Sequence, residues 1–336
     1  MDELEDSQLD TSAKLRSAPA PTITPDAVAA LPLARFRLVW VSQQQVPDSQ
    51  YLGSAWRGVF GHALRKLVCV TRMPDCTGFM LLSSCAYPYL FETSLQSTAS
   101  PGPSVTPAAH PLVLRMETSE CDARSPYTFS LVLMPGAVRF LGYIVRAFQE
   151  AASHGIGMQR YRFQLSQVLQ ECPAGSENWL PILNTEQRLA PQPASVVLIP
   201  DCPAKVRMRL TSPVRLRQKG NYLSGLDNVG DIVAAVLRRL LLLRAEHGEG
   251  RVEQDLSTWF TALRAVRPLA VNLHWHDWER YSNRQQSRMQ MGGLLGDVLL
   301  DGRQIEPYWS LLWVGQFVHI GKATSMGLGA YTVEEA

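Results

Sequence analysis

A histidine followed by two basic residues is the strongest candidate for acid–base chemistry in this chain. His62 lies in the stretch YLGSAWRGVFGHALRKLVC, where Arg65 and Lys66 follow it by about one helical turn. Histidine exchanges protons near neutral pH, and adjacent cations favour an anionic group such as a phosphate. The pattern therefore indicates proton transfer beside an anion. A polar histidine on a helix face would give the same spacing, so both interpretations stay open.

A run of basic residues with strand periodicity is the second candidate region. In KVRMRLTSPVRLRQK the first cations alternate with apolar residues, and no acidic residue lies among them. Like charges in register on a strand repel one another, so we expect a polyanion to bind this stretch. This basic strip consists of Lys205, Arg207, Arg209, Arg215, Arg217 and Lys219.

Arginines interleaved with aromatic residues occur again in WERYSNRQQSRMQMGG. Arg280, Arg284 and Arg288 follow one another at helical or loop spacing, with Trp278 and Tyr281 among them. Such stretches suit single-stranded RNA, because arginine contacts phosphates and aromatic rings stack on bases. Surface arginines beside two core aromatics are the equally weighted alternative for this stretch.

The C-terminal stretch HIGKATSMGLGAYTV forms a glycine-rich loop. It is not a nucleotide P-loop, because five residues separate Gly315 from Gly321 where that motif has four. What remains is a concavity with Lys322 and two hydroxyl side chains, Thr324 and Ser325, which suits a backbone phosphate. An ordinary glycine stop after a helix is the alternative.

Metal, redox and membrane functions have little support. His274 and His276 share one face of a predicted strand, but no third ligand is evident. The six cysteines contain no CxxC pair, so we expect reduced cytosolic thiols and neither a metal nor a cofactor. No run reaches the roughly 18 apolar residues of a membrane span, so we expect a cytoplasmic protein without a membrane partner.

Length and composition predict about two domains that must carry these residues. The 336 residues are 46% hydrophobic and 18% charged, as in soluble globular proteins. The net charge of +2 indicates no partner, because an acidic N-terminus offsets a basic surface. We expect a flexible arm, acidic and then Pro/Ala-rich, over residues 1–32, a first domain over 33–190 and a second over 191–336.

The same order of elements recurs in the two halves. Each half ends in a strand, a helix, a glycine turn and a strand, with HGIGMQRYRFQL closing the first and HIGKATSMGLGAYTV the second. A strand–helix–strand–strand–helix–strand unit is the ferredoxin-like fold. We therefore predict an α+β chain of two tandem ferredoxin-like domains. In the helix that carries His62, Gly58 and Gly61 share its polar face, which we expect something to approach closely.

Five stretches in this order resemble the CRISPR-associated RAMP endoribonucleases, which cut precursor CRISPR RNA at its repeats. They are YLGSAWRGVFGHALRKLVC, YPYLFET, TSPVRLRQKG, RYSNRQQSRMQMGGLLGDV and HIGKATSMGLGAYTV. The resemblance extends over nearly the whole chain from about residue 34 and is most specific from Trp278 to Val333. It implies two domains of the RNA-recognition-motif type, a central cleft, and a C-terminal glycine-rich loop that contacts RNA.

The resemblance also implies metal-independent cleavage. The ribose 2′-OH attacks the adjacent phosphate and leaves a 2′,3′-cyclic phosphate and a 5′-OH. His62 matches the family's catalytic histidine, Lys66, Arg65 and Arg57 would stabilise charge, and Tyr51 would position the nucleophile or act as the acid. The basic strip and the loop residues Lys322, Thr324 and Ser325 carry over as RNA-binding positions.

Two functions remain open at this stage. One is an endoribonuclease that cleaves CRISPR repeat RNA and keeps the mature guide RNA. The other is a non-catalytic RAMP subunit that holds guide RNA together with other subunits of a CRISPR effector complex. A more distant alternative is a metal-dependent phosphoesterase at His274 and His276.

Overall fold

The fold is known from a computed structural model. It describes residues 23–42, 44–46, 52–73, 76, 82, 84–92, 109–117, 126–218, 220–248, 250, 256–277, 279–282 and 287–336. For 279–282 and 287–290 only the backbone is described. Tyr51, Lys219 and Arg284 lie outside the described residues.

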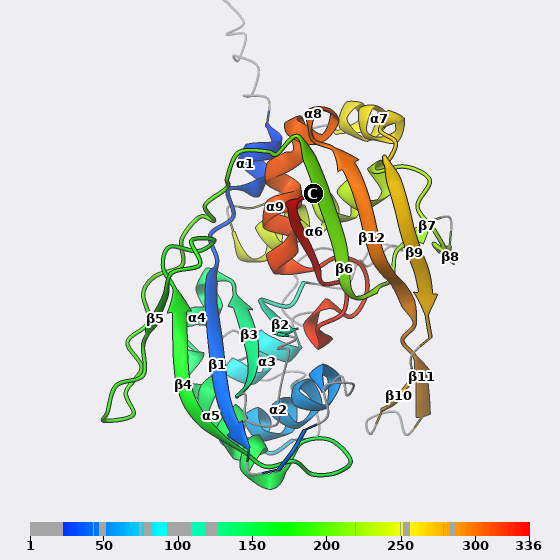
Figure 1. The fold of residues 1–336 in the computed structure, drawn as a ribbon. Coiled ribbons are helices and arrows are strands. Elements are labelled where there is room, and N and C mark those ends of the chain that lie inside the picture. Colours follow the sequence, from blue (N-terminus) through cyan, green and yellow to red (C-terminus); the bar gives the residue numbers. More distant parts are fainter. Residues whose placement is uncertain are drawn as a thin grey trace, which may run out of the picture.

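The first half of the chain forms an antiparallel sheet with the strand order β2-β3-β1-β4-β5. Two long helices, α2 and α5, pack against each other on one face of this sheet (Figure 1). The elements are β1 (Ala34–Ser42), α2 (Gly53–Val68), α3 (Ala86–Phe91), β2 (Leu112–Met116), β3 (Tyr127–Leu133), α4 (Pro135–Val138), α5 (Leu141–His154), β4 (Phe163–Glu171) and β5 (Trp179–Pro181).

Aromatic side chains hold α2 against this sheet. Trp56, Phe60 and Leu64 recur every four residues and are fully buried. The Trp56 ring lies 5.1 Å from that of Trp40 on β1, and Phe60 stacks on Phe148 of α5 at 4.3 Å. Because this apolar stripe faces the core, the opposite face of α2 is turned outward.

The second half forms a four-stranded antiparallel sheet with the order β13-β6-β12-β9. Helices α6 and α9 pack together behind it (Figure 1). The elements are β6 (Lys205–Val214), α6 (Gly230–His247), α7 (Ser257–Ala265), β9 (Ala270–His276), β12 (Gly293–Asp301), α8 (Gly302–Ile305), η2 (Glu306–Tyr308), α9 (Trp309–Val318), η3 (Thr324–Met326) and β13 (Tyr331–Glu335). Two small hairpins join them, β7 (Arg217–Gln218) with β8 (Asn221–Tyr222) and β10 (Glu279–Ser282) with β11 (Ser287–Gln290).

The two sheets share one topology. If the four principal strands of each sheet are numbered along the chain, both have the order fourth, first, third, second. A helix follows the first and the third of these strands in each half. This is the ferredoxin-like unit, so the predicted fold of two tandem ferredoxin-like domains is confirmed. The boundary expected between residues 190 and 191 lies in the segment that joins β5 to β6.

The expected N-terminal arm is folded over its last residues. Residues 25–29 form α1 (Pro25–Ala29), in which Val28 and Ala29 are fully buried against α6 and α9 of the second half. Arg244 on α6 also donates a hydrogen bond to the Ala27 carbonyl at 2.7 Å. The expectation of a flexible arm was therefore wrong for residues 23–32. Composition misled because the apolar partners of this short helix lie some two hundred residues further along the chain.

The segment that joins the two sheets is hydrogen-bonded to both halves. Ser195 exchanges backbone hydrogen bonds with Leu33, and the Leu198 amide donates to the Ala174 carbonyl at 2.8 Å. On the other side, the indole of Trp313 on α9 donates to the Leu198 carbonyl at 2.8 Å. The connection therefore fixes the first sheet relative to α9.

We expect two helical glycines to respond oppositely to substitution. A Cβ at Gly315 on α9 would collide with the Tyr331 hydroxyl and lie 2.6 Å from Val236 Cγ1, whereas a Cβ at Gly142 on α5 would meet nothing within 4 Å. Gly315→Ala should lower the free energy of unfolding by about 1–3 kcal/mol through overpacking. Gly142→Ala should raise it by about 0.5–1 kcal/mol through helix propensity. Urea denaturation of both variants measures this, and equal effects would contradict the close packing of α9.

Candidate functional site

The outward face of α2 borders a surface cavity of about 580 Å³. His62 and Lys66 lie one turn apart on this face and are exposed. The chain that leaves the helix supplies the rest of the wall. The lining residues are His62, Arg65, Lys66, Cys69, Arg72 and Met73. The predicted pair of a histidine and a lysine is therefore brought together in one cavity.

The cations of this cavity differ in their contacts. The Arg65 guanidinium donates to the Met73 carbonyl and lies 5.4 Å from the centre of the Tyr87 ring. Within the part of the chain that the structure describes, the side chains of His62, Lys66 and Arg72 form no hydrogen bond or ion pair. Arg72 is a site residue that the sequence did not indicate, because it lies beyond the end of the helix whose periodicity carried the prediction.

The glycines of α2 have a different role from the one expected. Gly61 is buried against α3, and a Cβ there would lie 2.7 Å from Phe91 Cε1. A Cβ at Gly58 would meet nothing within 4 Å. Arg57 also lies over the Phe91 ring, 3.4 Å from its centre, and does not line the cavity of His62. The close approach at this helix is thus made by α3, and the sequence-based grouping of Arg57 with His62 is not supported.

The glycine-rich loop closes on itself and on the end of β6. The Ile320 amide donates to the Gly329 carbonyl, and the Lys322 amide donates to the Arg215 carbonyl at 3.2 Å. Gly321 and Gly329 both have a positive φ, and a Cβ at Gly321 would lie 2.5 Å from the Arg215 carbonyl oxygen. Glycine is required here because the loop backbone approaches β6 too closely for a side chain.

The loop brings the two domains together. Its helical turn, η3, packs against β2 and α2 of the first domain (Figure 1). Thr324 and Ser325 are only 8% exposed, so the expectation that both hydroxyl side chains face a phosphate is not met. Lys322 is exposed and remains a candidate contact.

The basic strip has the predicted alternation of exposed and buried residues, but acidic residues lie beside its cations. Lys205, Arg207 and Arg209 are exposed, and the residues between them are buried. Acidic residues on the flanking strands offset the charge: the Arg209 guanidinium forms ion pairs with Asp297 at 2.9 Å and Glu334 at 3.7 Å. The sequence did not reveal these acids because they come from β12 and β13, about ninety and one hundred and twenty-five residues away.

The other end of the strip forms a basic and aromatic surface. The guanidinium groups of Arg215 and Arg217 lie 4.6 and 4.7 Å from the centre of the Tyr222 ring. The centre of the Trp275 ring is 6.3 Å from that of the Tyr222 ring. Lys322 lies beside this group because its backbone amide donates a hydrogen bond to the Arg215 carbonyl. We call Arg215, Arg217, Tyr222, Trp275 and Lys322 the Tyr222 surface.

The remaining predicted positions are less informative. Arg280 and Arg288 lie on the β10–β11 hairpin, so the expected helical or loop spacing was wrong. His274 and His276 are exposed on β9. Among the described residues, no group of three or more His, Cys, Asp or Glu could hold a metal ion. No helix in the described part of the chain is long and apolar enough to span a membrane.

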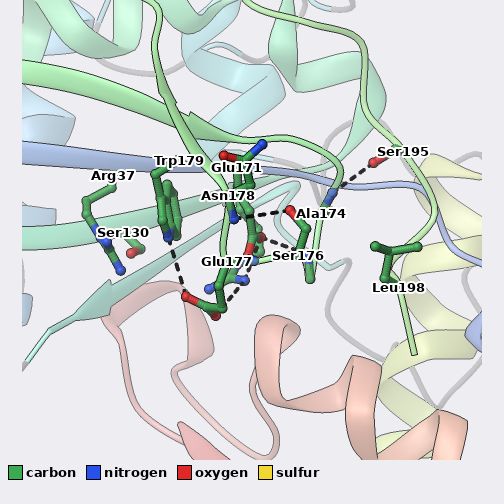
Figure 2. A network of polar contacts seen from close by, with 12 residues as sticks. Arg37, Ser130, Glu171, Ala174, Ser176, Glu177, Asn178, Trp179, Ser195 and Leu198 are labelled. Carbon is green, nitrogen blue, oxygen red and sulfur yellow. Dashed lines mark hydrogen bonds and ion pairs between the residues drawn. The ribbon is translucent and has the colours of Figure 1, made fainter. Parts of the chain in front are cut away.

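A second cavity, of about 790 Å³, lies between the two domains. Arg35 and Arg37 on β1 line one side of it, and Trp313 and Phe317 on α9 line the other. Arg35 forms a 2.6 Å ion pair with the buried carboxylate of Glu171, and Arg37 lies 4.0 Å from the centre of the Trp179 ring. Figure 2 shows Arg37, Trp179 and the turn that surrounds Glu171. This cavity corresponds to the expected central cleft.

Buried histidines lie around Arg239 where the domains meet. Burial, with the charges of Arg115 and Arg239, lowers the pKa of His319 to about 3. Burial, with the charges of Arg57 and Arg239, lowers the pKa of His110 to about 4. His319 is fully buried and its Nδ1 lies 3.2 Å from the Leu328 carbonyl, so it holds the glycine-rich loop rather than a ligand.

Solved structures share this fold. Two structures of a Thermus thermophilus Cas6 protein are similar over 91% of this chain. One, a product complex, has a TM-score of 0.52, 15% sequence identity and full coverage of its own chain. The other has a TM-score of 0.50, 13% identity and 99% coverage of its own chain. The comparison with curated protein sequences found no match.

Family models match both halves of the chain. Residues 31–194 match a model described as an N-terminal domain. Residues 208–331 match the model of the CRISPR-associated endoribonuclease Cas6. The second domain of the chain therefore matches a Cas6 endoribonuclease domain, and the whole chain shares the fold of the solved Cas6 structures.

The buried histidines predict acid sensitivity. His110 and His319 have pKa values of about 4 and 3 in the folded protein, against 6.5 when unfolded. Protonation therefore favours the unfolded chain, and stability is lost as the pH falls from 6.5 towards these values. Each histidine should cost at most about 1.4 kcal/mol per pH unit in that window. Urea denaturation between pH 7 and pH 5 measures the slope. His319→Gln should reduce the slope of the free energy of unfolding against pH, whereas His154→Gln, at an exposed position, should leave it unchanged. A slope that is unchanged in both variants would contradict the lowered pKa of His319.

Proposed function

We propose that this protein cleaves the repeat RNA of precursor CRISPR RNA by metal-independent attack of a ribose 2′-OH. The observation that carries the proposal is the cavity on α2, where His62, Lys66 and Arg72 have side chains without hydrogen-bond or ion-pair partners among the described residues. A histidine for proton transfer and adjacent cations for phosphate charge are what this reaction requires. The match of residues 208–331 to the model of the CRISPR-associated endoribonuclease Cas6 supports the same substrate.

His62 acts as the general base in this proposal. Its imidazole takes the proton of the 2′-OH while the 2′-oxygen forms a bond to the adjacent phosphorus. The bond from phosphorus to the 5′-oxygen breaks, and that oxygen takes a proton from an acid. Tyr51, which precedes α2, is our candidate for positioning the 2′-OH or for the acid. Lys66 stabilises the charge on the phosphate, and the products are a 2′,3′-cyclic phosphate and a 5′-OH.

The RNA leaves the cavity along the glycine-rich loop in this proposal. The loop supports such a path because η3 contacts α2, while Lys322 is hydrogen-bonded to Arg215 on the Tyr222 surface. Exposed Arg217 and Lys322 would contact phosphates, and the rings of Tyr222 and Trp275 would stack on bases. Because these contacts lie outside the cavity, cleavage does not remove them, and we propose that the mature guide RNA stays bound. Other CRISPR effector subunits would then bind the protein while it carries the guide RNA.

Replacement of His62 tests the cleavage. His62→Ala should lower the single-turnover cleavage rate of a repeat RNA in EDTA by at least about 100-fold, because the general base is lost. The RNA dissociation constant should change little. The matched control is His154→Ala, at an exposed position on α5, which should cleave at the wild-type rate. Wild-type protein that binds the RNA without cutting it would instead favour a guide-holding subunit.

Two arginines of the basic strip should differ in RNA binding. Arg217 is exposed beside the Tyr222 ring, whereas Arg209 is held by Asp297 and Glu334. Arg217→Ala should weaken binding and reduce the salt slope of log K by about 1, because one phosphate contact is lost. Arg209→Ala should have a smaller effect. Fluorescence anisotropy at several salt concentrations measures both, and a larger effect for Arg209 would contradict the proposed path.

A further inference from the structure

We propose that Arg72 binds the non-bridging oxygens of the scissile phosphate and is a catalytic residue of the cleavage reaction. This inference rests on the proposed function of the cavity around His62 and adds a residue to it. No sequence motif indicated Arg72, which lies in the turn after α2. Its assignment depends on its position in the cavity, its contacts and its backbone conformation.

The cavity carries an excess of positive charge. Six of the described residues line it; three of these are cationic, namely Arg65, Lys66 and Arg72, and none of the six is acidic. Such a concave basic surface favours an anion. Arg65 is already engaged by the Met73 carbonyl and the Tyr87 ring, whereas Lys66 and Arg72 are not engaged by any described residue. Of these two, an arginine presents a planar group that binds two phosphate oxygens at once.

The backbone of Arg72 is in a costly conformation. Its φ is +55°, in the left-handed region, where a residue with a side chain is destabilised by about 1–2 kcal/mol relative to its usual conformations. Glycine or asparagine would suit this position better. A strained residue that keeps a large charged side chain beside a cavity is the pattern expected at a functional site.

The neighbouring contacts hold the turn in this conformation. The Arg65 guanidinium donates to the carbonyl of Met73, the residue directly after Arg72. The Met73 amide donates a hydrogen bond to Thr71 Oγ1 at 3.5 Å. The Cys69 amide donates to the Arg65 carbonyl at 2.9 Å, in the hydrogen-bond pattern of the preceding helix. Arg65 is therefore a positioning residue: it holds the turn that presents Arg72 to the cavity.

The chemical role of Arg72 involves no proton transfer. While the bond from the 2′-oxygen to phosphorus forms and the bond to the 5′-oxygen breaks, the non-bridging oxygens gain negative charge. The Arg72 guanidinium donates hydrogen bonds to these oxygens and stays protonated throughout. The proton of the 2′-OH still goes to His62, and the 5′-oxygen still takes its proton from the acid. Arg72 thus stabilises the transition state more than the bound RNA.

Arg72→Gly is the test variant because glycine accepts the positive φ and removes the guanidinium. Single-turnover cleavage of a repeat RNA in EDTA, at several protein concentrations, separates the maximal rate from the half-saturating concentration. We expect the maximal rate to fall by about 100- to 1,000-fold, as for other lost transition-state donors, with a change of only a few-fold in half-saturation. Urea denaturation should show unchanged or higher stability.

A matched control exists in the same domain. Arg160 is also an exposed arginine in the left-handed region, with a φ of +51°, and it lies in the turn between α5 and β4. Arg160→Gly makes the same change in charge and backbone and should cleave at the wild-type rate. Added guanidinium chloride at millimolar concentration should restore part of the activity of Arg72→Gly and none to Arg65→Ala, because only Arg72→Gly leaves the phosphate site itself vacant.

Three outcomes would overturn the inference. The first is an unchanged maximal rate for Arg72→Gly, and the second is an effect confined to half-saturation. The third is an equal loss of activity in Arg160→Gly. In each case a wild-type protein that still cleaves, and a His62→Ala variant that does not, would leave the proposed function in place. A wild-type protein that does not cleave its repeat RNA would instead overturn the proposed function itself.

Discussion

The buried ion pair between Arg35 and Glu171 lies within the first domain and holds the guanidinium group that contacts the second domain. Both side chains are buried, with 7% and 0% of their surface exposed. The Glu171 carboxylate also accepts hydrogen bonds from the backbone amides of Gly175 and Glu177, and these bonds close the turn after β4 (Figure 2). The Arg35 guanidinium lies 4.2 Å from the centre of the Phe317 ring on α9. A buried charge without its partner would cost several kcal/mol, so Glu171 keeps the Arg35 guanidinium in place against α9.

The junction has a direct consequence for the candidate site. Helix α9 ends at Val318 and continues into the glycine-rich loop, so fixing α9 against β1 also fixes the start of the loop. The His319 ring is hydrogen-bonded through Nδ1 to the Leu328 carbonyl within this loop, and η3 packs against α2 of the other domain. The cavity of His62 and the Tyr222 surface therefore belong to different domains but are connected through one loop. In the proposed function, this connection would let the protein hold the RNA at the Tyr222 surface while it is cut in the cavity.

Residues of one type have different roles because their surroundings differ. Arg209 is neutralised by acids from neighbouring strands, Arg57 lies on an aromatic ring, and Arg65 holds a turn. The histidines separate in the same way: His62 is exposed in a basic cavity, whereas His319 is kept neutral by burial. Burial and contacts, more than residue type, decide which of these groups can act on a phosphate.

Much of the fold was predictable from the sequence because its signals are local. The apolar residues Trp56, Phe60 and Leu64 indicate α2 by their spacing, and the alternation in Lys205, Arg207 and Arg209 indicates the exposed face of β6. The order of strands, helices and glycine turns predicted the two ferredoxin-like domains. The folded N-terminal segment was missed because Val28 is buried only by α6 and α9, from the other end of the chain.

The sequence by itself therefore determined the elements, the repeat of the fold, the resemblance to CRISPR-associated RAMP endoribonucleases and the candidate pair His62 and Lys66. The tertiary structure decided which charged and polar side chains remain available to contact a ligand. It paired Arg209 with Asp297, buried Thr324 and Ser325, and placed Arg72 beside His62. The physical reason is that periodicity reports the face of an element on which a side chain lies. The neighbours that neutralise, bury or expose that side chain come from segments far away in the chain, and only folding brings them together.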